Sequence, residues 1–321
     1  MIFEKQVINI YKNTLLTRHD ADGSVFYFSK SDFPGLLCEE SSFTGNKGQR
    51  LSAYLYYRDA KRTDRLVIFE HGMGCGHAAY MKEVNLLTEH GYTVFTYDHT
   101  GTRCSEGENI GGFSQSLADL DYAIRAIRRM PEYKDTPLSV IGHSWGGFST
   151  MNIPAIYPEI THVVALSGFI STKAIQDQSL GGILKFYRKC VYSLEREALP
   201  GYFGYSATDS LKNKATKALI IHSKDDPVVK SEYHFELLRR ELAGLPNIEF
   251  LELNGKSHNP NYTADAIAYK NSFFQALKKA KKKKMLSTEK EKKDFVSSFD
   301  WHRMTAQDMS VWDKIFAFLE K

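Results

Sequence analysis

The chain has 321 residues, of which 42% are hydrophobic and 13% aromatic, an ordinary composition for a globular protein with one large or two modest cores. Its formal net charge of +4 is small, and much of the positive charge lies in one lysine-rich run. Composition therefore offers no argument for a nucleic-acid partner. No stretch approaches the roughly 18 apolar residues of a membrane span, and residues 1–16 resemble no secretory signal. These observations predict a protein without stable membrane insertion.

The four cysteines are scattered along the chain without paired spacing. They stand at Cys38, Cys75, Cys104 and Cys190. Such spacing suits free thiols in a reducing compartment better than a disulfide framework. We therefore expect a cytoplasmic protein.

The first elements along the chain are an extension and a hairpin. Residues 1–36 show no strong periodicity and are expected to lie over the surface as an N-terminal extension. Two strand-like stretches then flank a Gly-Asn-Lys-Gly turn at residues 45–48, which predicts an edge hairpin over residues 37–58. A short apolar run at residues 66–69 has the character of a strand buried on both faces of a parallel sheet, and it ends at His71-Gly72-Met73-Gly74.

Strands and helices alternate from here to residue 253. Expected helices cover residues 79–90, 113–129 and a stretch from 148, and expected strands cover residues 92–97, 138–143, 162–166, 218–222 and 248–253. This alternation predicts a doubly wound, mostly parallel α/β sheet with helices on both faces. The core would comprise residues 37–170 and 215–321.

Two segments depart from the alternation. Residues 171–214 are aromatic-rich and follow a core strand, so we expect a small lid insertion there; a helical connection packed on the sheet is the alternative. Residues 264–295 are expected to be helical and carry a lysine-rich run at 278–293, which either meets an acidic partner or membrane headgroups, or is simply a solvated helix end. A final helix, opened by a capping box of Thr305 and Asp308, closes the chain.

The stretch Gly142-His143-Ser144-Trp145-Gly146 lies where an expected strand becomes a helix. A reversal within about three residues forces the central residue to positive φ, and only small neighbours fit around it. Gly142 and Gly146 supply that space. The G-x-S-x-G pattern is that of a nucleophile elbow, which makes Ser144 a candidate nucleophile.

A serine hydroxyl needs a base within hydrogen-bond reach, and the base needs an acid that orients it. Asp225 and Asp226 follow the expected strand 218–222, and His258 follows the strand 248–253. Because parallel strands end at one edge of the sheet, these side chains are expected near Ser144. The residues alone leave either aspartate open as the acid.

The motifs together resemble those of α/β-hydrolases of the monoacylglycerol lipase, lysophospholipase and serine aminopeptidase type. His71-Gly72-Met73-Gly74 is similar to the H-G-x-G oxyanion loop, residues 98–105 to D-x-R-G-x-G-x-S, and Asp226-Pro227 to the acid turn. Three positions depart from the pattern: Thr100 replaces arginine, Arg103 replaces glycine, and Ser223 replaces the glycine three residues before the acid.

The resemblance implies an α/β-hydrolase sheet with a lid and a serine hydrolase that cleaves a lipid-like or aromatic ester through an acyl-enzyme, without a cofactor. It assigns Ser144 as nucleophile, His258 as base and Asp226 as acid, with Asp225 as the alternative. The backbone N–H groups of Met73 and Trp145 would form the oxyanion hole. A small-molecule ester is then the expected partner.

Other functions remain open at this point. An aminopeptidase or amidase and an acyltransferase would use the same three residues, and a ligand-binding protein could keep the fold with little turnover. A metal site built from His71, Cys75 and His77 is not expected, because their spacing matches no tetrahedral motif.

Overall fold

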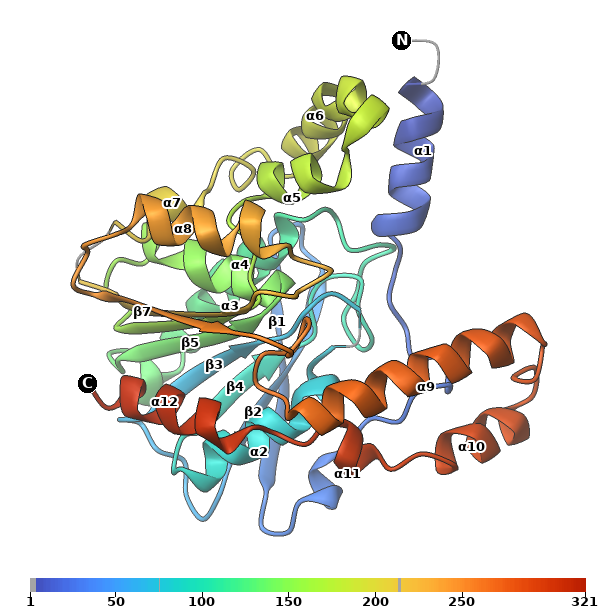
Figure 1. The fold of residues 1–321 in the computed structure, drawn as a ribbon. Helices are drawn as coiled ribbons and strands as arrows, with labels where there is room; N and C mark the ends of the chain where they lie inside the picture. The colour runs from blue at the N-terminus through green and yellow to red at the C-terminus, as the bar shows by residue number, and fades with distance from the viewer. Residues whose placement is uncertain (1–3, 75, 213–214) are drawn as a thin grey trace.

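A central sheet organises the molecule. The computed structural model describes residues 4–74, 76–212 and 215–321, and within these ranges eight strands form one sheet (Figure 1). The strands are β1 Leu37–Thr44, β2 Arg50–Tyr57, β3 Leu66–Glu70, β4 Thr93–Tyr97, β5 Leu138–His143, β6 His162–Leu166, β7 Lys217–Ser223 and β8 Ile248–Leu253. Their order is β1-β2-β4-β3-β5-β6-β7-β8, and only β1 with β2 and β2 with β4 pair antiparallel. The predicted edge hairpin and the mostly parallel α/β sheet are confirmed.

Helices cover both faces of the sheet, as the alternation predicts (Figure 1). They are α1 Glu4–Leu15, α2 Met81–Glu89, α3 Gln115–Arg128, α4 Trp145–Asn152, α5 Thr172–Ser179, α6 Arg188–Ala198, α7 Ala207–Ser210, α8 Phe235–Glu241, α9 Ala264–Lys282, α10 Glu289–Ser297, α11 Trp301–Met304 and α12 Met309–Leu319. Helices α3 and α4 lie on one face, and α2 and α12 lie on the other (Figure 1).

The side chains of β3 explain why the sequences of the inner strands are continuous apolar runs. Leu66 and Ile68 belong to the core on one face of the sheet, whereas Val67 and Phe69 belong to the core on the other. All four are at most 2% exposed. Since successive side chains point to opposite faces, a strand covered by helices on both sides needs apolar residues at every position.

The expected N-terminal extension contains a helix that the sequence did not predict. Residues 4–15 form α1, which packs beside α6 at the top of Figure 1. Tyr11 of this helix is buried and donates a hydrogen bond to Glu195 Oε1 of α6 at 2.5 Å. A helix held by tertiary contacts with a segment 184 residues away carries little signal in its own sequence.

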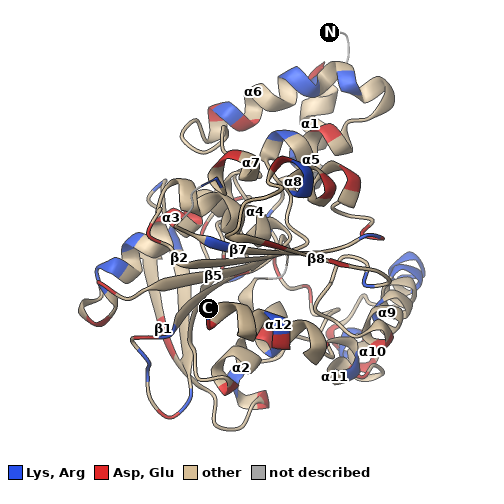
Figure 2. Cartoon of the chain, turned by 60° about the vertical axis from the view of Figure 1, so that its left-hand side comes forward, with Lys and Arg blue, Asp and Glu red and all other residues tan. Residues whose placement is uncertain are grey.

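The expected long helix over residues 264–295 is instead two helices, α9 and α10. Lys284, at φ +55°, reverses the chain between them, and the pair projects from the rest of the molecule (Figure 1). Lysines gather toward its outer end (Figure 2). Some of them pair with carboxylates: Lys281 with Asp22 at 2.8 Å and Lys292 with Glu289 at 2.7 Å.

The predicted capping box of Thr305 and Asp308 is also wrong. Asp308 itself caps α12, because its carboxylate accepts a hydrogen bond from the N–H of Ser310 at 3.0 Å, whereas Thr305 ends α11. Among the helices in the described ranges, none is long and apolar enough to cross a lipid bilayer.

The connection from β5 to α4 is a close approach of strand and helix backbone. A Cβ atom on Gly142 would lie 2.3 Å from the carbonyl oxygen of Gly146, and one on Gly146 would lie 2.3 Å from the carbonyl oxygen of Glu70. These contacts are with backbone atoms, which cannot rotate aside. The strand and the helix can approach this closely only because both positions are glycine.

We expect Gly146→Ala to lower the free energy of unfolding by about 2 kcal/mol or more, since overpacking against a rigid backbone displaces α4 from β3. Urea denaturation of the purified variant measures this change. Gly204→Ala is the control, because a Cβ there meets no atom within 4 Å, and its effect should stay within about 0.5 kcal/mol. Equal stabilities of the two variants would contradict the argument.

Candidate active site

Ser144 lies at the bend between β5 and α4 with φ 56° and ψ −111°, the positive φ that the elbow pattern predicts. Two backbone hydrogen bonds hold this conformation. The Ser144 N–H donates to the carbonyl of Leu166 in β6 at 2.8 Å, and its carbonyl accepts from the N–H of Phe148 at 3.0 Å. The neighbouring strand and the first turn of α4 thus fix the serine on both sides.

His258 lies between Ser144 and Asp226. Its Nε2 is 2.9 Å from Ser144 Oγ and its Nδ1 is 2.8 Å from Asp226 Oδ2. Asp226 comes from the loop after β7 and His258 from the loop after β8, so the sheet edge brings the three together as the chain order implies. Serine, imidazole and carboxylate form one continuous hydrogen-bonded chain.

Asp226 is buried and remains ionised. Burial raises the pKa of this carboxyl, but its hydrogen bond with His258 and the N–H groups of Val228 and Val229, at 2.8 and 3.0 Å from Oδ1, outweigh burial and leave the pKa below its ordinary value. An ionised carboxylate accepts the Nδ1–H of His258. That tautomer leaves Nε2 able to accept the proton of the Ser144 hydroxyl.

Asp225, the alternative acid, points to other partners. Its carboxylate accepts hydrogen bonds from the hydroxyl of Ser223 at 2.5 Å, from the N–H of Gly255 at 2.9 Å and from the N–H of Ser257 at 3.3 Å. Ser257 has φ 50° and directly precedes His258. Asp225 therefore ties the loop after β7 to the loop that carries the histidine. This contact also accounts for Ser223, which stands where the family pattern has glycine.

The two residues predicted for the oxyanion hole both adjoin Ser144. Trp145 is the first residue of α4, and the first N–H groups of a helix have no partner within it. Its side chain is buried, and its indole N–H donates to the Phe113 carbonyl at 2.6 Å, which fixes the start of the helix. Met73, on the loop after β3, lines the same cavity as Ser144.

A second layer of hydrogen bonds links the loop after β3 to the histidine loop. The Gly72 N–H donates to Tyr80 Oη at 3.0 Å, Tyr80 Oη lies 2.8 Å from His143 Nδ1, and His143 Nε2 lies 2.7 Å from the His258 carbonyl. Burial, and then the nearby His258, lower the pKa of His143 to about 3. The neutral ring of His143 therefore donates a hydrogen bond from Nε2–H to the backbone carbonyl of His258 and accepts one from the Tyr80 hydroxyl at Nδ1.

The sequence did not reveal this network. It places Tyr80 at the start of an expected helix and His143 beside the candidate nucleophile, but no pattern pairs residues 63 positions apart.

A cavity of about 190 Å³ adjoins the serine and the histidine. Its lining residues are Gly72, Met73, Ala79, Tyr80, His143, Ser144, His258, Asn259, Tyr262 and Lys270. None of these is acidic. The described residues of the expected lid, 171–212, contribute nothing to this lining, and residues 213–214 lie outside the described residues.

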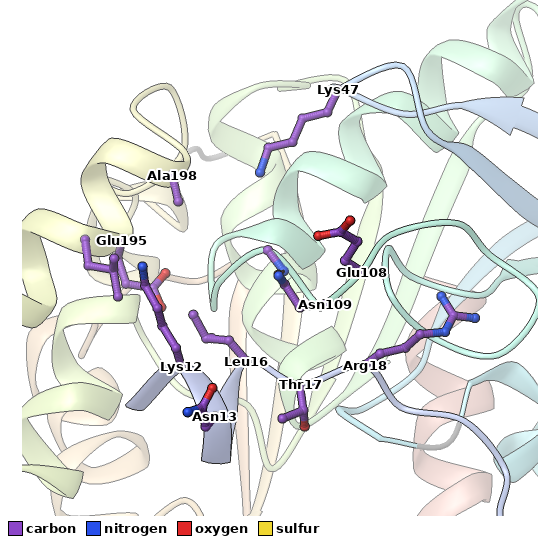
Figure 3. A pocket seen from close by; sticks show the side chains of 12 residues that line it. Lys12, Asn13, Leu16, Thr17, Arg18, Lys47, Glu108, Asn109, Glu195 and Ala198 are labelled. Atoms are coloured by element: carbon purple, nitrogen blue, oxygen red, sulfur yellow. The ribbon is translucent and has the colours of Figure 1, made fainter. Parts of the chain in front are cut away.

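A larger cavity of about 600 Å³ lies elsewhere, between α1, α6 and the loop around Asn109. Charged side chains of both signs surround it, Lys12 and Lys47 against Glu108 and Glu195 (Figure 3). None of the predicted site residues lines it. Volume alone therefore does not identify the reactive site in this molecule.

The histidines of the loop after β3 have partners within the protein. His71 Nδ1 bonds the Gly72 carbonyl at 2.7 Å, and His77 Nδ1 bonds Asp98 Oδ1 at 2.9 Å. Cys75 lies outside the described residues. Among the residues that are described, no group of three or more His, Cys, Asp or Glu side chains is placed to hold a metal ion.

Comparison with known proteins relates the chain to hydrolases. The family model described as serine aminopeptidase, S33 (Hydrolase_4) matches residues 61–213, a little under half of the chain. The monoglyceride lipase of Mus musculus is 28% identical over 105 residues, 32% of this chain and 34% of that protein. The enzyme of the same name from Rattus norvegicus is 28% identical over 94 residues, 29% of this chain and 30% of that protein. The matched stretches thus span about a third of the length of these curated relatives.

Solved structures share the fold over most of the chain. An esterase of Pyrococcus furiosus superposes with a TM-score of 0.59 at 18% identity, over 83% of this chain and 99% of the other. The α/β hydrolase GrgF of Penicillium sp. sh18 superposes with a TM-score of 0.53 at 18% identity, over 69% of this chain and 91% of the other. At these identities the superpositions show a common fold.

We expect Tyr80→Phe to slow the reaction of Ser144 with a fluorophosphonate probe about tenfold, because it leaves the Gly72 N–H and His143 Nδ1 without their shared hydroxyl. The measurement is the second-order rate of labelling of the folded protein. Tyr122→Phe, on α3, is the matched control. Unchanged labelling in Tyr80→Phe would mean that the network does not position the site.

Proposed function

We propose that this chain, which belongs to the α/β-hydrolase superfamily, is a serine hydrolase that cleaves carboxylic esters of lipid-like or aromatic acids through an acyl-enzyme. The observation that carries the proposal is the continuous chain of hydrogen bonds from Ser144 Oγ through His258 to Asp226. The three groups stand in the order nucleophile, base and orienting acid that acyl transfer requires. The names of the relatives, lipases and esterases, agree with this chemistry.

The first half of the reaction would form the acyl-enzyme. Ser144 Oγ attacks the ester carbonyl while His258 Nε2 takes the hydroxyl proton, and Asp226 stabilises the resulting imidazolium. The N–H groups of Met73 and Trp145 would receive the oxyanion of the tetrahedral intermediate, each lowering the barrier by about 3 kcal/mol. The intermediate then expels the alcohol, which takes the proton from His258, and the acyl group remains on Ser144.

In the second half, water would replace the alcohol. His258 removes a proton from water as it attacks the acyl carbonyl, and the collapse of the second intermediate returns that proton to Ser144 Oγ and releases the acid. Every proton in this scheme is transferred by His258. The steps therefore require no cofactor.

The lining of the site cavity favours an ester over a peptide with a free amino terminus. An aminopeptidase needs a carboxylate to hold the substrate ammonium, yet none of the ten lining residues is acidic and Lys270 is among them. A substrate ammonium beside this lysine would be repelled. An acyltransferase would share the same acyl-enzyme, and product analysis in the presence of added alcohols separates it from a hydrolase.

The segment 171–214 is proposed as a cap beside the site rather than as part of its cavity. Gln178 of α5 bonds the loop that follows Asp226, donating to the Val228 carbonyl at 2.8 Å and accepting from the Lys230 N–H at 2.9 Å. Exposed apolar side chains follow, among them Ile183 and Phe186. Because these apolar side chains are exposed, we propose that they contact the apolar part of a substrate.

A cytoplasmic setting is likewise proposed for this activity. Cys38, Cys104 and Cys190 are free thiols in the described part of the chain. Free thiols support a reducing environment.

We expect the wild-type protein to be labelled by a fluorophosphonate probe and to hydrolyse a series of p-nitrophenyl esters, with turnover peaking at one acyl length. Ser144→Ala should lose labelling and reduce kcat by at least about 10⁴-fold, since it removes the nucleophile. Mass spectrometry of the labelled peptide identifies the modified residue. A wild-type protein that is not labelled would point to the ligand-binding alternative.

Substitution of the two neighbouring aspartates should affect kcat differently. Asp226→Asn is expected to lower kcat by about 10⁴-fold, because an amide no longer holds His258 in the required tautomer. Asp225→Asn should chiefly lower stability, through its loop contacts, and retain most of kcat. Measured kcat and melting temperature for both variants decide the assignment, and the reverse pattern would make Asp225 the acid.

A further inference from the structure

We propose that the ammonium group of Lys270 binds an anionic group, a carboxylate or phosphate, that the ester substrate carries close to its scissile bond. The inference rests on the proposed function and adds a substrate class to it. A further residue, outside every motif in the sequence, would then determine specificity.

Lys270 occupies the second turn of α9, and its side chain reaches the wall of the cavity that also contains Ser144 and His258. Nζ donates to Asn259 Oδ1 at 2.8 Å and lies 5.0 Å from the ring centroid of Tyr262. Tyr262 is buried, and Asn259 directly follows His258. The ammonium is thus held at a defined place by the loop that carries the histidine.

The side chains that line the cavity carry a net positive charge. Its lining contains no Asp or Glu, and Asp226 lies behind His258. Glu83 is buried and does not line the cavity, and it accepts hydrogen bonds from the side-chain amides of Asn261 and Gln307 at 3.0 and 3.1 Å. Burial raises the pKa of Glu83 to about 7 while the charge of Lys270 acts in the opposite direction, so Glu83 offsets the lysine charge only in part. A partly enclosed cavity with a net cation attracts anions more strongly than an open surface does.

The size of the cavity sets the distance between the anion and the reacting carbonyl. Lys270 and Ser144 both line one cavity of about 190 Å³. An anionic group bound by Lys270 would therefore share this small space with the carbonyl attacked by Ser144. Charge-assisted hydrogen bonds of this kind orient the substrate as well as bind it.

The experiment compares pairs of esters that differ in one negative charge. For the acyl side, p-nitrophenyl hemisuccinate is paired with p-nitrophenyl butyrate; for the alcohol side, 3-acetoxybenzoate is paired with phenyl acetate. Each kcat/KM is divided by the rate of the same ester with hydroxide, which removes intrinsic reactivity. We expect the wild-type protein to prefer the anionic ester in one pair, and that pair identifies the side that faces Lys270.

Lys270→Gln should reduce this preference at least tenfold, and Lys270→Arg should restore most of it, because arginine keeps the charge. Lys278→Gln, an exposed lysine two turns further along α9, is the matched control for long-range charge effects and should leave the preference unchanged. Added salt should weaken the preference of the wild-type protein and have little effect in Lys270→Gln. Thermal melts verify that each variant is folded.

The inference is overturned if the wild-type protein shows no preference in either pair, or if Lys270→Gln keeps it. In either case Ser144-dependent hydrolysis of the neutral esters would leave the proposed function intact. Absence of both hydrolysis and fluorophosphonate labelling would instead refute the proposed function, and the inference with it.

Discussion

The reversal of the chain at Ser144 is the constraint on which the rest of the site depends. A positive φ at a serine costs about 1–3 kcal/mol, and the fold tolerates it because Gly142 and Gly146 allow backbone contacts that a side chain would block. The bond from the Ser144 N–H to Leu166 ties the bend to the neighbouring strand. The same reversal directs the amino end of α4 toward the serine, so one local conformation exposes a hydroxyl and aligns helix N–H groups beside it.

Around this bend, adjacent residues with the same chemistry have different surroundings. Asp226 meets His258 and two backbone N–H groups, while Asp225 joins the loops after β7 and β8. His258 meets the serine, whereas burial keeps His143 neutral so that it bridges Tyr80 and the His258 backbone. The second residue of each pair holds the loops in place. For the two aspartates, a difference of one position along the turn thus decides whether the side chain contacts His258 or supports its loop.

The cavity beside the serine is small, and its lining comes from the β5–α4 elbow, the segment after β3, the loop that carries His258 and α9, with no described residue of the expected lid. The larger cavity beneath α1 shares no residue with it. Because the proposed oxyanion groups are backbone N–H groups, the side chains around them are free to vary with the substrate. Under the proposed function, substrate preference would depend on the residues that α9 and the loops supply, with a single lysine, Lys270, in a lining that contains no carboxylate.

The sequence by itself determined the sheet, the elbow and the order Ser144, Asp226, His258, because these depend on local signals: apolar runs of strand length, glycines where a turn needs them, and polar residues just after each strand. The cap at Asp308 and the capping box of Thr288 and Glu291 that opens α10 are local features too, although they were not predicted. Only the tertiary structure decided the packing of α1 against α6 and brought Tyr80 and Lys270 to the site. These features depend on contacts between segments distant in the chain, and such contacts leave no periodic pattern in either segment alone.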